Sequence, residues 1–276
     1  MGTKIKVKKG TVEETLLLPL WGRAYETQKK NPRIIDNKAV EIMSKLDYDF
    51  SDIAKTQTIS QHGWVARCMH MDKLVEEFIT KYPEATIVNI GCGMDTTFSR
   101  VDNGQIRFYE LDLPDVIALR KNFYADSERH QSIASSFLET EYFKQIAVKK
   151  GLLFLAGGVF MYFTEEQMKT FFKQVADSFP KCDFYFDALT PKGFNIAKKQ
   201  VLKKGGMSMA LDGGWSLADA KDLEEWDKRF HLIKYKPMYK GTKKHIPLMH
   251  KIILTITDTI NMGGMIHLRI NEEDKR

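Results

Sequence analysis

The sequence has few cysteines, no long apolar segment and no internal repeat, and these absences narrow the class of protein. Its 276 residues include only three cysteines, Cys68, Cys92 and Cys182, whose spacing matches neither a metal site nor a redox pair. This odd set of thiols favours a reducing compartment, so we expect a cytoplasmic protein without a metal ion. The longest apolar run, residues 152–163, is far shorter than the roughly 20 residues of a membrane span.

The composition is basic, with a formal charge of +6 and a pI near 9.0. Many of the lysines gather late in the chain, at Lys198, Lys199, Lys203, Lys204, Lys234, Lys236, Lys240, Lys243 and Lys244. A basic surface attracts anionic substrates or nucleic acid, but the favoured interpretation of these lysines is a solvated helix face and loops. No DNA- or RNA-binding motif accompanies them, so we expect neither a nucleic-acid nor a membrane partner.

The first third of the chain has helical periodicity. The pattern predicts helices over residues 38–46 and 64–82. An earlier helix contains Pro19, which we expect to bend or restart it. The polar, mixed composition of residues 45–62 predicts a loop.

From Ala85 onward, short strands alternate with helices. Strands are predicted at 86–90, 106–111, 132–134, 152–155, 183–189, 231–235 and 265–270, with helices from Pro114 and over 164–179, 219–229 and 247–260. With 43% hydrophobic residues the chain can supply one large core. The alternation predicts a doubly wound α/β fold with a mostly parallel seven-stranded sheet. We expect one domain, with residues 1–84 as a helical cap and lid and residues 85–276 as the Rossmann-like core.

A glycine-rich turn follows the first predicted strand of this core. Gly91 and Gly93 allow a sharp turn and a close approach of ligand to backbone. The third glycine of the dinucleotide fingerprint is absent, because Thr96 occupies its place, which disfavours a pyrophosphate on the helix N-terminus.

The next strand ends in two acidic residues, Glu110 and Asp112, which face the same side of the strand. An acid at this strand end can accept hydrogen bonds from both hydroxyls of a ribose, and Asp112 lies closer to the expected crevice. The alternative is that Asp112 only caps the helix that begins at Pro114.

Three motifs in this order resemble one family of enzymes. Residues 88–97 (VNIGCGMDTT), 109–116 (YELDLPDV) and 153–163 (LFLAGGVFMYF) are similar to the leucine carboxyl methyltransferase superfamily, and more closely to its tetracenomycin-type polyketide O-methyltransferase branch. Residues 18–36, 64–72 and 212–226 extend the resemblance, which covers about residues 11–270. It implies the class I methyltransferase fold and S-adenosylmethionine as cofactor.

The resemblance also implies a set of cofactor contacts. Arg67 matches an arginine that binds the methionyl carboxylate, a task for which the bidentate guanidinium is suited. Asp112 matches the ribose-binding acid, and Arg23 loosely matches a basic residue of the N-terminal helix near the cofactor. The remaining implied contacts are Asn89, Gly91, Cys92, Gly93, Leu113, Ser135, Ser136, Phe137 and Gly157, with Ser135 to Phe137 flanking adenine.

The sequence departs from the family pattern at two places. The protein-methylating branch carries an aspartate near the adenine, where this chain has Ser135 and Ser136. Many relatives carry a glutamate that holds the amino end of the cofactor, where this chain has Gly157. A backbone carbonyl near Ala156 is the simplest replacement, and we expect the missing side chain to leave room for substrate.

Methyl transfer from a sulfonium is an in-line displacement that mainly requires alignment and exclusion of water. A carboxylate acceptor needs no base, whereas a phenol benefits from one, so no catalytic residue follows from the sequence. Tyr162 is a candidate for orienting a substrate oxygen, although the favoured interpretation is a buried aromatic of the cluster at residues 160–163, and Asp187 is a second candidate. We expect His231 to be structural or exposed.

We expect an O-methyltransferase that acts on a hydroxyl or carboxyl group of a small, polyketide-like molecule. Its apolar pocket would be formed by Trp21, Tyr25, Met207, Met209 and Trp215, each of which can instead be ordinary core. The alternatives are methylation of a protein C-terminal carboxylate and a non-catalytic S-adenosylmethionine-binding protein. Oxidoreduction with NAD is disfavoured by Thr96. The sequence predicts no oligomeric state.

Overall fold

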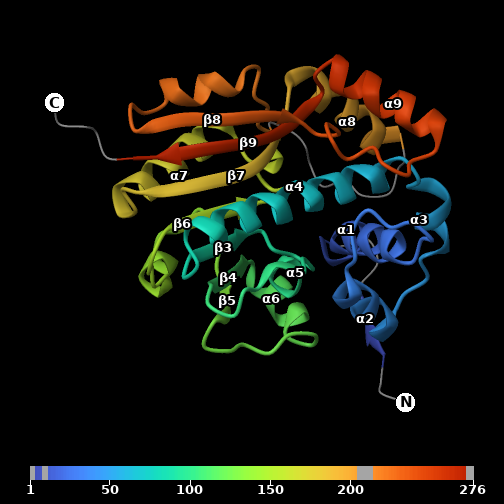
Figure 1. Ribbon diagram of the computed structural model, residues 1–276, viewed down its shortest axis with the longest axis horizontal. Coiled ribbons are helices and arrows are strands. Elements are labelled where there is room, and N and C mark those ends of the chain that lie inside the picture. The colour runs from blue at the N-terminus through green and yellow to red at the C-terminus, as the bar shows by residue number, and fades with distance from the viewer. Residues whose placement is uncertain (1–3, 8–11, 204–213, 272–276) are drawn as a thin grey trace.

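The computed structural model of the protein describes residues 4–7, 12–203 and 214–271, and its centre is one seven-stranded sheet (Figure 1). The strand order is β5-β4-β3-β6-β7-β9-β8, and β9 runs antiparallel to both of its neighbours. The strands are β3 (Thr86–Ile90), β4 (Arg107–Asp112), β5 (His130–Ala134), β6 (Leu152–Ala156), β7 (Cys182–Leu189), β8 (Phe230–Pro237) and β9 (Gly263–Ile270). The predicted doubly wound, mostly parallel sheet is confirmed.

The strand order reverses at β3, which pairs in parallel with β4 on one side and with β6 on the other. In open α/β sheets, ligands bind at such a switch point, in the crevice outside the carboxyl ends of the strands. The fold therefore places a binding site at the ends of β3, β4 and β6.

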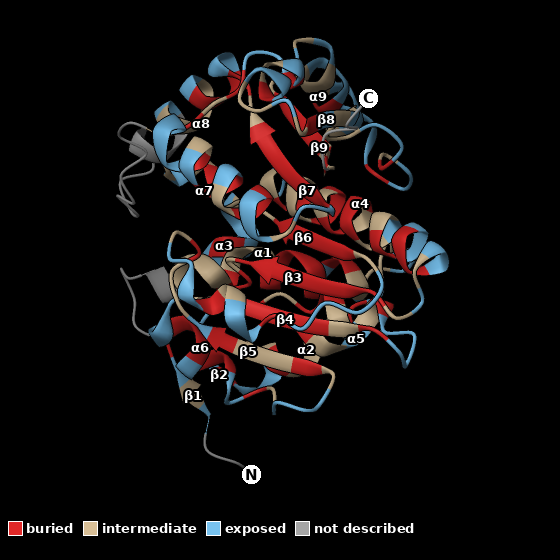
Figure 2. Ribbon diagram, turned by 90° about the vertical axis from the view of Figure 1, so that its left-hand side faces the viewer, coloured by how far each residue is buried: buried red, intermediate tan, exposed pale blue. Residues whose placement is uncertain are grey.

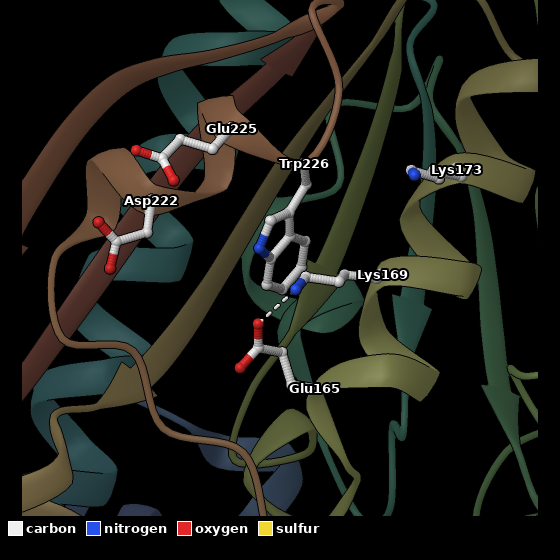
Figure 3. Close-up of a pocket in the computed structure, with 6 residues that line it drawn as sticks. All are labelled: Glu165, Lys169, Lys173, Asp222, Glu225 and Trp226. Atoms are coloured by element: carbon white, nitrogen blue, oxygen red, sulfur yellow. Dashed lines mark ion pairs between the residues drawn. The ribbon is translucent and has the colours of Figure 1, made fainter.

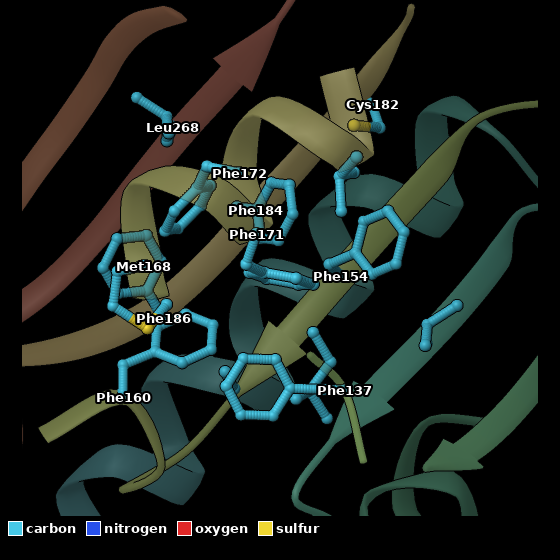
Figure 4. Close-up of a cluster of buried hydrophobic side chains, with 14 of the residues drawn as sticks. Phe137, Phe154, Phe160, Met168, Phe171, Phe172, Cys182, Phe184, Phe186 and Leu268 are labelled. Carbon is cyan, nitrogen blue, oxygen red and sulfur yellow. The ribbon is translucent and has the colours of Figure 1, made fainter. Parts of the chain in front are cut away.

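Helices cover both faces of the sheet, since its strands are apolar on both sides (Figure 2). On one face, α4 (Ser60–Lys81) packs through Met71, Val75 and Phe78 against Leu153 and Leu155 of β6. On the other face, α7 (Glu165–Ser178) packs into a cluster rich in phenylalanine (Figure 4). Alternate residues of one strand therefore belong to two different cores.

The N-terminal region contains α1 (Val12–Thr27), α2 (Asn37–Lys45), α3 (Ser51–Thr56) and a small parallel pair, β1 (Ile5–Lys6) with β2 (Leu46–Asp47). The helix does not restart at Pro19, because α1 continues through it. Burial of Leu17 and Leu20 on either side holds the helix despite the lost N–H. The expected loop at 45–62 is also wrong, because β2, α3 and the start of α4 occupy it.

The elements that remain are α5 (Thr97–Val101), α6 (Pro114–Arg120), α8 (Pro191–Lys203), α9 (Leu248–Thr259) and three short 3-10 helices, η1 (Glu141–Gln145), η2 (Phe160–Tyr162) and η3 (Ala220–Glu225). The α-helix expected over 219–229 is only η3, which begins where the Asp219 side chain accepts the N–H of Lys221. Among the described residues, no helix is long and apolar enough to cross a membrane, and no cluster of three potential metal ligands occurs.

Candidate functional site

The turn after β3 requires glycine at two positions. Gly91 and Gly93 have φ angles of +60° and +48°, a conformation that strains other residues. A Cβ atom on Gly91 would lie 2.4 Å from Cγ2 of Val159, and one on Gly93 would lie 3.0 Å from Cδ2 of Leu16. Val159 after β6 and Leu16 of α1 thus pack directly against the backbone of the turn.

Asp112 ends β4 beside this glycine turn. Its Oδ2 accepts the N–H of Gly93 at 2.7 Å, and its Oδ1 accepts the N–H of Leu113 at 2.8 Å. Burial raises the pKa of Asp112 above its ordinary value, although these two N–H groups oppose the rise. The N-cap of α6 is Leu113, without a side-chain capping bond, so Asp112 is not the cap of that helix.

Glu110, two residues earlier, is fully buried and used inside the protein. It pairs with Arg120 and accepts the Asn89 amide at 2.9 Å. Arg120, also fully buried, donates to the carbonyls of Gly93 at 3.0 Å and Asp95 at 2.7 Å. The site therefore contains a buried arginine that holds the glycine turn. In the sequence this residue was recognisable only as an arginine that follows the apolar residues of α6.

The N-terminal helices are tied to the same turn through Asp36. Its carboxylate accepts Nε of Arg23 and Nη1 of Arg100, both at 2.9 Å, and the hydroxyl of Thr96. Burial opposes ionisation, but the two arginines hold the pKa of Asp36 below its usual value. Arg23 also donates to the carbonyl of Met94 at 2.7 Å, so the structure places it against the glycine turn.

Arg67, Gly158 and Asp187 form one unit at the ends of β6 and β7. Nη2 of Arg67 pairs with Oδ2 of Asp187 at 2.9 Å, and Oδ1 of Asp187 accepts the N–H of Gly158 at 2.6 Å. Asp187 is 3% exposed, and both its oxygens are engaged. Nε of Arg67 is buried and finds no hydrogen-bond partner among the described residues. A buried donor without a partner is costly unless a ligand completes it.

Gly157 precedes this unit, and its surroundings are already filled. A Cβ atom there would lie 3.0 Å from Cε of Met71 and 3.1 Å from Cδ of Arg67. The expectation that the missing side chain leaves room for substrate is therefore wrong, because two side chains of α4 occupy that direction.

Tyr162 lies in η2, beyond the same strand end. Its interpretation as a buried aromatic is wrong, because the residue is 41% exposed. Loss of solvent around its hydroxyl raises the pKa of Tyr162. The charge of Arg67 lowers this pKa, and the charge of Asp187 raises it. Tyr239, which the sequence did not single out, also interacts with Arg67, and burial together with Asp258 raises its pKa to about 12. His231 is exposed on β8, as expected.

The segment after β5 lies beside Asp112, since the N–H of Ser135 donates to the Asp112 carbonyl at 2.9 Å. Ser135 and Ser136 are partly exposed, and Leu113 is 46% exposed. The rings of Phe137 and Phe163 pack 4.7 Å apart within the phenylalanine cluster. The serines and Leu113 are therefore accessible side chains beside Asp112.

The aromatic residues expected to form one pocket are not together. Trp21 stacks on Tyr25 with ring centroids 5.0 Å apart, and its edge faces Trp64 at 6.4 Å. Trp215 instead packs on Trp226 at 5.4 Å inside the core of the sheet, so its assignment to a pocket wall is wrong. Met207 and Met209 lie outside the described residues.

A hollow of about 460 Å³ lies between α7 and η3 (Figure 3). It is lined by Glu165, Lys169, Lys173, Asp222, Glu225 and Trp226. Lys169 already pairs with Glu165 at 2.6 Å and lies over the Trp226 ring. No residue of the glycine turn or the Arg67 unit lines this hollow, so it does not mark the site at the strand ends.

The sheet order with one antiparallel strand, the glycine turn after β3 and the acid ending β4 define a class I methyltransferase, which uses S-adenosylmethionine. Solved structures share this fold. A DUF574 family protein from Streptomyces avermitilis has a TM-score of 0.57 at 12% identity, covering 91% of this chain and 97% of that one. The plantazolicin methyltransferase BamL, solved with a desmethylPZN analogue and SAH, has a TM-score of 0.52 at 10% identity, covering 95% and 98%.

Sequence comparison identifies the family. Residues 17–176, more than half of the chain, match the model of the leucine carboxyl methyltransferase family, and the chain belongs to this family. The tetracenomycin polyketide synthesis O-methyltransferase TcmP of Streptomyces glaucescens is 28% identical over 215 residues, 77% of this chain and 78% of that protein. The S-adenosyl-L-methionine-dependent methyltransferase dpfgK of Gibberella zeae is 24% identical over 289 residues, 95% of each chain. The protein is thus an S-adenosylmethionine-dependent O-methyltransferase.

The residues at the strand ends fit this cofactor. The buried Nε of Arg67 is a donor that a carboxylate can complete, and the two serines and Leu113 offer partly exposed surface beside Asp112. Asp112 ends β4, and the side chain of Arg67 reaches from α4 to Gly158 after β6, while β3 with its glycine turn lies between β4 and β6. This order matches a molecule with an amino acid at one end and a nucleoside at the other.

Proposed function

We propose that this chain methylates a hydroxyl or carboxyl oxygen of a small, largely apolar molecule. The single observation that carries the proposal is the buried Nε of Arg67, which has no hydrogen-bond partner in the described part of the chain, near the exposed Tyr162. The first group provides a place for the cofactor carboxylate, and the second lies where an acceptor would enter. The name of the relative TcmP, a polyketide O-methyltransferase, supports a small molecule as the acceptor.

The proposed cofactor contacts follow the order of the strands. Asp112 would accept hydrogen bonds from the ribose hydroxyls, while Asn89 and Arg120 keep the glycine turn in place. Arg67 would bind the methionyl carboxylate, and Ser135, Ser136 and Leu113 would flank adenine. The cofactor itself supplies a methyl group activated by a sulfonium.

The chain's own contribution is alignment rather than base catalysis. Asp187 is already bound by Arg67 and by the N–H of Gly158, so we propose that it positions Arg67 and does not take a proton. Tyr162 would orient the acceptor oxygen through its hydroxyl. An acceptor that is ionised near neutral pH, a carboxylic acid or an acidic phenol, suits such a site best.

The test is a methyl-transfer assay with labelled S-adenosylmethionine against phenols, aromatic acids and a peptide that ends in leucine. Turnover of one of the small molecules supports the proposal. Turnover of the peptide alone would assign the chain to protein carboxyl methylation. Tight cofactor binding without any turnover would favour a binding protein. Tyr162→Phe should lower turnover at unchanged cofactor affinity. The control Tyr82→Phe, at a tyrosine that packs against Gly151 just before β6 begins, should leave turnover unchanged.

A further inference from the structure

Helix α9 presents apolar side chains to solvent instead of to the core. Leu248, Met249, Ile252 and Ile256 are exposed by 73%, 66%, 47% and 54%, and we call them the α9 stripe. At about 100° per residue the stripe spans about 100° of the helix, centred opposite the buried Leu254. A surface helix normally has the reverse arrangement, with its apolar side facing the core. Apolar patches of this kind mark contact surfaces.

The segment that contains α9 has an excess of positive charge. Residues 240–262 contain four lysines, Lys240, Lys243, Lys244 and Lys251, and a single acid, Asp258. Asp258 pairs with Lys243 at 3.0 Å, while the other three lysines are exposed. The helix that carries the apolar stripe therefore also carries the exposed Lys251, and it follows a segment with the exposed Lys240 and Lys244.

Three kinds of partner could cover an apolar and basic surface: a second copy of the chain, a nucleic acid and a lipid surface. A second copy docked by a two-fold axis would bring the same lysines face to face, which like charges oppose. A nucleic acid would neutralise the lysines but would not bury four aliphatic side chains. An anionic lipid surface does both, since its phosphates attract lysines and its acyl boundary accepts apolar side chains.

We propose that α9 docks the protein on an anionic lipid surface, which revises the expectation of no membrane partner drawn from the sequence. The α9 stripe enters the boundary between headgroups and acyl chains, and Lys244 and Lys251 contact lipid phosphates. This is peripheral binding by one face of a helix, distinct from a membrane span.

Helix α9 packs on α4, the helix that carries Arg67, through the side that faces away from the stripe. Nε2 of His62 on α4 lies 3.0 Å from Nδ1 of His250 on α9, and Arg67 follows five residues later on α4. Figure 1 shows α9 above the N-terminal end of α4. Resting on the proposed function, this arrangement suits an apolar acceptor that partitions into lipid.

The experiment is vesicle flotation with two compositions, phosphatidylcholine alone and phosphatidylcholine mixed with phosphatidylglycerol in equal parts. We expect binding to the anionic vesicles and a loss of at least about tenfold for Ile252→Ser/Ile256→Ser. Lys244→Gln and Lys251→Gln should each weaken binding about fivefold, with a smaller dependence on salt. Ile233→Ser, at a 45% exposed position on β8, is the matched control and should bind like the parent.

Three results would overturn the proposal. They are no flotation of the parent with anionic vesicles, flotation that the Ile252→Ser/Ile256→Ser change leaves intact, and a lipid-free dimer in sedimentation that the same change dissociates. Because these positions lie outside the site, the variants should bind S-adenosylhomocysteine like the parent in lipid-free buffer, which also checks their folding. Methyl transfer in that buffer tests the proposed function separately, so failure of either proposal is recognised without the other.

Discussion

Arg67→Lys tests whether the arginine on α4 holds the cofactor carboxylate. In the structure Nη2 is bound by Asp187 at 2.9 Å, and the buried Nε has no partner among the described residues. A guanidinium can thus bind Asp187 and a ligand together, whereas a single ammonium cannot reproduce this fork. Losing one hydrogen bond to a charged group costs about 1.5–3 kcal/mol, or roughly 10- to 150-fold in affinity.

The assay is calorimetry with two ligands, S-adenosylhomocysteine and methylthioadenosine, which lacks the amino-acid end. Arg67→Lys should weaken the first by the stated factor and leave the second nearly unchanged. Arg129→Lys, at an arginine that pairs with Asp102 on the surface, is the matched control. An equal loss for both ligands would refute the assignment, because it would mean that Arg67 acts through the folding of the site.

Asp112→Ala should weaken both ligands by about 1.5–3 kcal/mol, and unchanged affinity in calorimetry would remove it from the ribose site. Arg120→Met leaves Glu110 buried without its main partner, so denaturant unfolding should show a loss of about 3–5 kcal/mol; a loss below 1 kcal/mol, roughly that of a surface pair, would contradict this. Burial, then Arg33, lowers the pKa of His62 from 6.5 to about 4. The unfolded chain binds the proton first, so His62 costs stability, up to about 3 kcal/mol, as pH falls from 6.5 to 4. His62→Gln should flatten that pH dependence, and an unchanged slope would show that other groups cause it.

The sequence predicted the elements whose signals are local. Strand β3 was placed at its observed bounds because a β-branched run ends at Gly91. The continuous helix α1 was not predicted, because only the burial of its side chains explains why it continues through Pro19. The 3-10 helix η3 was expected as a longer α-helix, because its apolar spacing is compatible with either kind of helix. It ends at Glu225, and a turn in which the N–H of Phe230 donates to the Asp227 carbonyl leads into β8.

The candidate site was predictable in its motifs but not in its partners. The glycine turn and Asp112 follow from spacing alone. The Arg67–Asp187 pair joins residues 120 positions apart on α4 and β7, and no local pattern relates them. The filled space at Gly157 depends likewise on Met71 of α4, which the sequence presents only as one residue of a helical repeat.

Contacts between the N-terminal helices and the glycine turn cross the expected boundary between cap and core. Residues 1–84 were expected as a cap on a core formed by residues 85–276, yet Leu16 packs against Gly93 and Arg23 binds the Met94 carbonyl. Asp36 is shared by Arg23 of the cap and Arg100 of the core, and it is buried, so removing either side leaves an uncompensated charge. Helix α4 lies within the cap range but packs on the sheet as core. We therefore propose that the glycine turn takes its binding conformation only when the N-terminal helices are in place, which makes cap and core one cooperative unit.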